Sequence, residues 1–360
     1  MRLKIIALTL LFVGGGLWVH AQSVRKYSNE FLKIGVGARA SSMGNAMVGI
    51  VDDVTSGYWN PGGLNLAPEA PEVALMHSEY FAGIAKYDYV GFTMPIGGGR
   101  RFGASVIRLG VDDIANTLNL VDANGNIDFD AVETFSVADL GIMLSLAQRF
   151  EFLGGMNVGA NFKLVNRSVG KFANAWGFGL DVGARWDLDE LQLGVMLQDV
   201  TSTFNAWSFN TETFEEAFVQ TGNVIPENSL EVTLPSVKLG GGYRFLKDKK
   251  VNLLLAVDTD IHFDGARNVV ANLGSVSIDP HAGLEISYNN LAFLRGGFKN
   301  LQKTPNDKGE DTFSVFPTMG AGFMLKNFTV DYALSNVGNF SQTLYSHVFS
   351  LRYTFGNVRR

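Results

Sequence analysis

The side chains that could support chemistry in this sequence are few and widely separated. Asp52 and Asp53 are adjacent carboxylates, which could act as an acid and a base, or could cap a helix and pair with a cation such as Arg39. We favour the structural role. The stretch from Gly35 to Ala40 meets the loosest form of the dinucleotide-binding fingerprint, but no predicted strand precedes it and no βαβ unit follows. We therefore predict no bound cofactor.

An acidic stretch is the second candidate, because its side-chain oxygens recur at the spacing of a calcium loop. The positions are Asp122, Asn124, Asn126, Asp128, Asp130 and Glu133. Gly125 comes one position earlier than an EF-hand loop requires, and no predicted helices flank the stretch. We favour an outer loop turned by Asn-Gly over a calcium site, and the sequence leaves that question open.

The composition excludes several classes of protein. The chain has 360 residues, of which 46% are hydrophobic and only 18% are charged, with 41 glycines and 27 phenylalanines. Such a chain is not disordered, and its net charge of −6 argues against nucleic acid as a partner. It has no cysteine, and its five histidines are scattered without a pair at ligand spacing. We therefore predict no metal site built on His or Cys ligands, and no enzyme.

The first residues have the pattern of an export signal. Arg2 and Lys4 precede an apolar run from Ile5 to Trp18, and Val19-His20-Ala21 then fits a signal peptidase site. We expect a signal peptide at 1–21, with an uncleaved anchor as the alternative. No later stretch approaches 18 uninterrupted apolar residues, so the sequence predicts no transmembrane helix.

The rest of the chain alternates between apolar and polar residues with a period of two, which is the pattern of strands with one apolar face and one polar face. Trp176, Phe178 and Leu180, for example, alternate with Gly177 and Gly179. Fourteen such runs are found, most of them long enough for a tilted strand to cross a bilayer. They span 71–80, 86–96, 102–111, 137–148, 155–167, 175–186, 191–199, 234–245, 250–261, 278–288, 291–299, 313–326, 327–335 and 345–355.

The connections between these runs decide between a soluble sandwich and a membrane barrel. Short links such as 97–101 and 187–190 alternate with longer ones such as 112–136 and 200–233, and only 81–85 breaks the rule. Outer-membrane barrels have short periplasmic turns and long outer loops. The sequence therefore predicts an all-β fold, a 14-stranded antiparallel transmembrane β-barrel, over 71–360.

The polar faces of these strands should line the lumen. They carry Lys163, Arg167, Asp181, Arg185, Lys238, Arg244, Asp258, Asp260, His281, Glu285, Asp331 and Arg352. A selective pore is one reading of these charges of both signs. We favour a structural network of ion pairs, because a polar interior at membrane depth must satisfy its own groups.

The Gly-rich residues before the first strand carry a family resemblance. Gly37-Ala38-Arg39-Ala40, Met43-Gly44, Asp52-Asp53 and Tyr58-Trp59-Asn60-Pro61-Gly62 follow one another in this order. The segment resembles the PorV/PorQ family of Bacteroidetes outer-membrane proteins, a branch of the FadL-like barrels. It departs from the family pattern at Ser41-Ser42 and at Gly62. The resemblance implies a 14-stranded barrel in the outer membrane and an association with type IX secretion.

Residues 22–70 are expected to form a plug or periplasmic segment. The motif residues that we expect to hold it are Arg39, Asp52, Asp53, Trp59, Asn60 and Pro61. We expect residues 31–66 to lie at the periplasmic end of the barrel and partly inside it, with Trp59 buried and a turn at Asn60-Pro61.

Two functions remain open after this reading. The first is a barrel that binds proteins of the type IX system, either translocon subunits or secreted clients. We expect Trp207 and Phe209 in the loop 200–233 to make the contact. The alternative for this loop is that it folds over the mouth of its own barrel. The alternative function is a FadL-like transporter of hydrophobic small molecules. The resemblance to the FadL-like barrels implies a sideways opening at a distorted third strand. Here the third run, 102–111, is the least regular, because Val106-Ile107 breaks the alternation and Gly110 could bend the strand. The sequence identifies neither a particular partner nor a conducting lumen.

Overall fold

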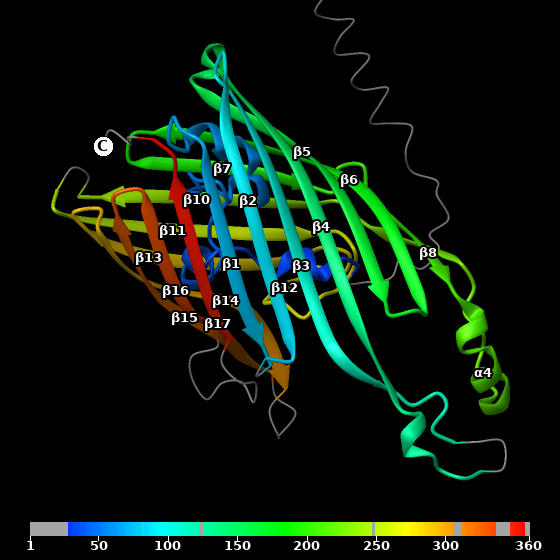
Figure 1. Ribbon diagram of the computed structural model, residues 1–360. Helices are drawn as coiled ribbons and strands as arrows, with labels where there is room; N and C mark the ends of the chain where they lie inside the picture. The colour runs from blue at the N-terminus through cyan, green and yellow to red at the C-terminus, as the bar shows by residue number, and fades with distance from the viewer. Residues whose placement is uncertain are drawn as a thin grey trace, which may run out of the picture.

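The computed structural model describes residues 28–81, 83–121, 125–246, 249–305, 311–335 and 346–356, so the expected signal peptide lies outside the described residues. In this part of the chain, one antiparallel sheet contains 17 strands, and all but β8, β9 and β12 form a ring that the β1–β17 pairing closes (Figure 1). The ring strands are β1 (Glu72–Tyr80), β2 (Ala85–Gly97), β3 (Arg100–Asn116), β4 (Glu133–Phe150), β5 (Met156–Val169), β6 (Ala173–Leu188), β7 (Leu191–Gln198), β10 (Ser236–Phe245), β11 (Val251–His262), β13 (Ser277–Tyr288), β14 (Ala292–Pro305), β15 (Asp311–Leu325), β16 (Phe328–Ser335) and β17 (Ser346–Thr354). The predicted fourteen-stranded barrel is confirmed.

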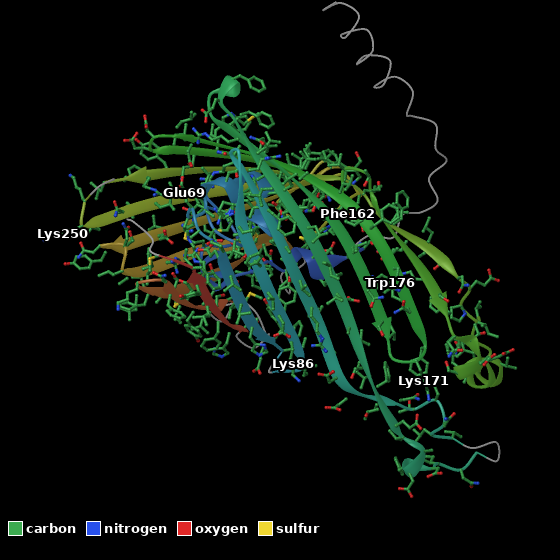
Figure 2. The ribbon with its side chains drawn as sticks, turned by 45° about the horizontal axis from the view of Figure 1, so that its top comes forward. Glu69, Lys86, Phe162, Lys171, Trp176 and Lys250 are labelled. Atoms are coloured by element: carbon green, nitrogen blue, oxygen red, sulfur yellow. The ribbon has the colours of Figure 1, made fainter. Side chains whose placement is uncertain are left out.

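The period-two pattern places apolar side chains outside the wall and polar ones inside. Trp176 and Phe178 are 60% and 58% exposed, whereas Asp181 and Arg185 on the opposite face are buried. Phe162 and Trp176 lie on the wall between the two ends of the barrel (Figure 2). Among the described helices, none is long and apolar enough to cross a membrane.

The two ends of the barrel differ, as the link lengths predict. At the short-turn end, Gly97 to Arg100 joins β2 to β3, and Asn289 to Leu291 joins β13 to β14. At the long-loop end, several connections contain their own elements. These are η3 (Phe129–Ala131), β8 (Thr203–Phe209), η5 (Thr211–Thr213), α4 (Glu215–Thr221), β9 (Ser229–Thr233) and β12 (Ala271–Asn272).

The segment predicted as a loop over 200–233 is folded. β8 pairs with the end of β6, and β9 pairs with β8, so this hairpin extends the wall beyond the ring (Figure 1). The sequence did not predict these two strands, because the alternation of apolar and polar residues in β8 does not continue through the turn that follows it.

The prediction of an irregular third strand was wrong in its position. Ile107 is fully buried and faces inward, so the alternation continues through Val106-Ile107. β3 stays paired with β2 from Arg100 to Val111, and its register shift against β4 lies beyond, between Val111 and Ile114. Asp113 adopts a φ of 57° in this bulge. The wall is therefore closed along the pairing of β2 with β3.

Residues 28–66, called the inner segment below, lie inside the ring. They form η1 (Glu30–Lys33), α2 (Ala38–Ser42), α3 (Ser56–Trp59) and η2 (Pro61–Leu66), drawn in blue in Figure 1. Glycines allow its backbone to touch the wall. A Cβ atom on Gly49 would lie 2.7 Å from the Gly240 carbonyl carbon, and one on Gly62 would lie 2.7 Å from the Asn157 carbonyl oxygen. The glycines of the inward faces therefore belong to a filled lumen.

Candidate functional site

The inner segment extends along the lumen from one end to the other. At the long-loop end, Asn29 donates to Thr233 of β9 at 2.9 Å and accepts from Asn205 of β8 at 3.0 Å. At the short-turn end, Asn65 Nδ2 donates to the Gly99 carbonyl at 3.1 Å. Between these two ends, Tyr87 of β2 donates to the Phe31 carbonyl at 3.1 Å, so the segment also contacts the wall near its start.

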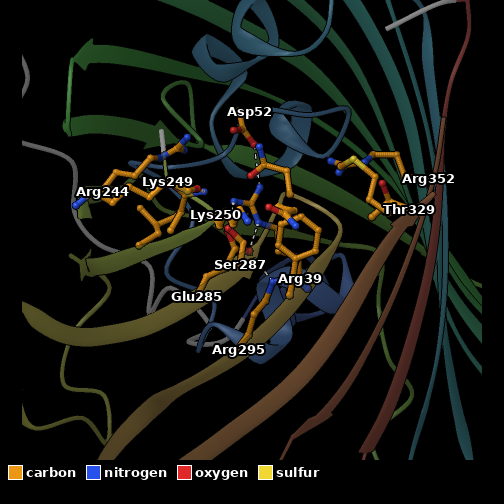
Figure 3. A pocket seen from close by; sticks show the side chains of 16 residues that line it. Arg39, Asp52, Arg244, Lys249, Lys250, Glu285, Ser287, Arg295, Thr329 and Arg352 are labelled. Carbon is orange, nitrogen blue, oxygen red and sulfur yellow. Dashed lines mark hydrogen bonds and ion pairs between the residues drawn. The ribbon is translucent and has the colours of Figure 1, made fainter. Parts of the chain in front are cut away.

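Arg39 is the centre of a buried ion network between the inner segment and the wall (Figure 3). Its Nη1 lies 2.8 Å from Asp52 Oδ1, and its Nε lies 3.1 Å from Glu285 Oε2 on β13. Glu285 also pairs with Arg295 of β14 at 2.6 Å, and Arg295 pairs with Asp331 of β16 at 2.6 Å. Opposite charges thus alternate from α2 across three strands, which satisfies each of them.

The charge on Asp52 is stabilised by this network. Burial alone would raise the pKa of Asp52, but the Arg39 guanidinium outweighs that effect and lowers the pKa to about 2. The carboxylate therefore stays ionised, and its pKa is far from that of a general base at neutral pH.

Asp53 is engaged in a second network with β17. It accepts hydrogen bonds from the backbone and side chain of Thr55, at 2.8 and 2.5 Å, and from Arg352. Glu72 of β1 accepts from Val54 N at 2.7 Å and from Thr354 Oγ1 at 3.0 Å. Asp53 thus joins the segment to β17, whereas Asp52 pairs with Arg39 of the segment itself, which in turn contacts β13.

The remaining motif residues fix the path of the backbone. Trp59 is buried, and its indole Nε1 donates to the Val36 carbonyl at 3.0 Å. Asn60 Nδ2 donates to the carbonyls of Val48 and Ala184, each at 3.0 Å, while its Oδ1 accepts from Gly62 N at 3.1 Å. Pro61 begins η2, where a missing N–H costs nothing.

Other lumenal charges are paired along the wall. Lys163 lies 2.9 Å from Asp181 and 2.6 Å from Asp199, and Lys238 lies 2.6 Å from Asp260. Several of these residues were predicted to line the lumen, whereas their partners Arg295, Asp139, Asp199 and Glu72 were not. Arg295 was detectable, because it occupies an inward position of its strand.

An apolar cavity of about 530 Å³ lies at the long-loop end. It is bounded by β3, β4, β5, β6, β8 and α4, and its lining residues are Ala115, Asn116, Thr117, Leu118, Phe135, Val169, Phe172, Ala173, Trp207, Phe209, Phe214, Phe218 and Pro226. Trp207 is opposite the buried Ala175 in the β6–β8 pairing, whereas Ala206 is opposite the exposed Trp176. The cavity therefore faces the axis of the barrel and not the lipid side.

Polar contacts hold one wall of this cavity. Trp207 Nε1 donates to Glu231 at 2.7 Å, and the Arg167 guanidinium lies over the Trp207 ring at 5.2 Å. Arg167 also pairs with Asp139 at 2.9 Å. The two aromatics expected to bind partners, Trp207 and Phe209, are half-buried and line the cavity together.

The acidic stretch offers no metal site in the part that the structure describes. Asp122 and Asn124 lie outside the described residues, and Asp128 accepts a hydrogen bond from Asp130 N at 3.0 Å. No group of three or more potential ligands gathers among the described His, Asp and Glu side chains.

Comparison with known proteins identifies the fold. No family model and no curated protein matches the sequence. Among solved structures, the chain is similar to the toluene transporter TbuX of Ralstonia pickettii, with 14% identity, a TM-score of 0.54, and coverage of 89% of this chain and 99% of that one. The toluene transporter TodX of Pseudomonas putida gives 14% identity, a TM-score of 0.56 and coverage of 89% and 98%. A FadL homologue of Pseudomonas aeruginosa gives 11% identity, a TM-score of 0.52, and coverage of 89% of this chain and 98% of that one. The chain thus has the fold of the FadL-type barrels, as predicted.

Proposed function

We propose that this protein is an outer-membrane barrel that takes up small hydrophobic molecules, which it first binds in the apolar cavity at the long-loop end. The observation that carries the proposal is this cavity of about 530 Å³, which has the volume and the aromatic lining of a small-ligand site. The toluene transporters among the structural neighbours support it. The exposed apolar wall and the unequal ends suit a membrane in which the long-loop end faces outward.

The inner segment makes passage a gated step in this proposal. Its ion networks and glycine contacts occupy the lumen below the cavity, so a bound molecule passes only if part of the segment moves. Tyr87, Tyr89 and Ile107 of β2 and β3 are buried against the inner segment, so its movement would uncover an apolar surface along these strands.

Binding of radiolabelled toluene to the purified barrel in detergent tests the proposal. Ala173→Trp fills the cavity and is expected to lower the affinity at least tenfold. Ala206→Trp adds the same side chain to the opposite face of the neighbouring strand and should leave the affinity within twofold. Equal binding by both variants would show that toluene associates with the protein elsewhere.

A second candidate function is the binding of type IX secretion proteins, translocon subunits or secreted clients. The motif over residues 37–62 favours it through its resemblance to the PorV/PorQ family. The projecting hairpin and α4 also expose Val219, Val224 and Leu230, at 66%, 89% and 61%. Replacing these three residues by serine should abolish copurification of secretion-system subunits and leave toluene binding intact. Copurification unchanged by the triple variant counts against this surface.

A further inference from the structure

The short-turn end contains a polar cavity of about 770 Å³, which the proposed uptake of apolar molecules does not use. It lies between the inner segment and the turns that follow β10 and β13 (Figure 3). Six cations line it, namely Arg39, Arg244, Lys249, Lys250, Arg295 and Arg352, against two lining carboxylates, Asp52 and Glu285.

Three of these cations form ion pairs in the networks described above. Arg39 and Arg295 share Glu285 and also pair with Asp52 and Asp331, and Arg352 pairs with Asp53 and Glu72. These three side chains are therefore held by carboxylates and supply no free positive charge to the cavity.

The other three cations, Arg244, Lys249 and Lys250, form no ion pair within the described part of the chain. Arg244 is near enough to lower the pKa of Asp52, but that carboxylate is already held by Arg39. Lys249 and Lys250 are exposed at the rim, on the turn between β10 and β11. Figure 3 shows these three side chains on one side of the cavity and Arg352 with Thr329 on the other.

We propose that this cavity binds small anions that carry two or more carboxylate or phosphate groups. Its volume lies within the range of ligand sites, about 300–1,000 Å³. Arg244, Lys249 and Lys250, which have no ion-pair partner among the described residues, lie together on one side of it and attract anions there. Ser287, Asn252 and Thr329 lie among the lining residues and supply neutral hydrogen-bonding groups. A multivalent anion could reach both sides at once, which a single carboxylate or chloride ion could not.

Isothermal titration with citrate and with pyrophosphate, at low ionic strength in a neutral detergent, tests this site. The variant Arg244→Gln/Lys249→Gln/Lys250→Gln removes the three cations that have no ion-pair partner. It is expected to lower the affinity for both anions at least tenfold. The matched control is Lys86→Gln/Arg108→Gln/Lys171→Gln, which removes three positive charges at the opposite end; Lys86 and Lys171 are visible there in Figure 2. This control should change the affinity by less than twofold.

Two results would overturn the proposal. One is the absence of citrate and pyrophosphate binding by the unmodified barrel. The other is an equal loss in both triple variants, because binding would then follow net charge and not the cavity. If the first triple variant does not fold, Lys249→Gln/Lys250→Gln keeps the test, since both side chains are exposed on a turn. That double variant should lower the affinity for citrate at least threefold, and an unchanged affinity contradicts the proposal.

Discussion

Removal of the Arg39 guanidinium should release the inner segment from the barrel wall. Arg39→Gln leaves Asp52 without its partner and Glu285 with Arg295 alone. Breaking a buried ion pair by removing one partner costs about 3–5 kcal/mol. Asp52 keeps 35% of its side chain exposed, so solvent screening reduces that cost here. We expect about 1.5–3 kcal/mol, which is roughly a 10- to 150-fold increase in the open population.

Thiol labelling measures this opening directly, because the chain has no native cysteine. Ser41 lies in α2, two residues from Arg39, and is only 4% exposed, so Ser41→Cys should react with a maleimide only when the segment opens. Arg39→Gln should raise the labelling rate of Ser41→Cys by the factor above. Lys33→Gln is the matched control, since its partner Glu30 keeps Arg267 as a second cation, and it should change the rate less than threefold.

The same network predicts a pH dependence with a definite sign. The pKa of Asp52 is lowered from 3.8 to about 2 in the folded barrel, so its stabilising effect is complete above pH 4 and is lost as the pH falls toward 2. Cleavage of the inner segment by pepsin should therefore accelerate between pH 4 and pH 2, and more steeply in the unmodified protein than in Arg39→Gln. Equal labelling rates at pH 7 and parallel pepsin profiles would refute this account of the network.

Three further predictions concern packing and the cavity. Gly49→Val should displace the inner segment and raise the labelling rate of Ser41→Cys at least tenfold, because a Cβ would lie 2.7 Å from the Gly240 backbone. Gly241→Ala should leave the rate unchanged, because the nearest atom to its Cβ is 3.8 Å away. Lys163→Met leaves Asp181 and Asp199 buried without their cation and should destabilise the barrel by about 3–5 kcal/mol in denaturant titrations; the exposed Lys171→Met should change stability by less than about 0.5 kcal/mol. Trp207→Phe keeps an aromatic ring but loses the hydrogen bond to Glu231, so it should cost about 1–3 kcal/mol and speed proteolysis of the β8–β9 hairpin, and an unchanged cleavage rate would contradict the contact.

The barrel itself could be predicted because its signal is local. Runs such as 175–186 and 278–288 differ from β6 and β13 by at most two residues at either end, since the lipid-facing and lumenal sides impose opposite residue types at each step. The glycines on the inward faces have a physical reason that only the structure shows, which is the close approach of the wall to Gly49 and Gly62.

The site was less predictable because it depends on pairs that are distant in sequence. Arg39 and Asp52 are 13 residues apart and could be proposed as partners, whereas Arg39 and Glu285 are 246 residues apart and meet only through strand order. Ile107 was misread because an inward apolar residue breaks a polar face, and the reason is its contact with the equally apolar inner segment. The aromatics of 200–233 were found, but their arrangement around a cavity needed the pairing of β8 with β6.

Diffraction from crystals soaked in bromobenzene tests the proposed function most directly, because bromine gives an anomalous signal that locates the ligand without ambiguity. The account predicts a bromine peak inside the apolar cavity, between Phe172, Trp207 and Phe214, and its loss in Ala173→Trp. Bromine peaks found only on the lipid-facing wall, with the cavity empty at saturating bromobenzene, would contradict the claim that this barrel binds small hydrophobic molecules at its long-loop end.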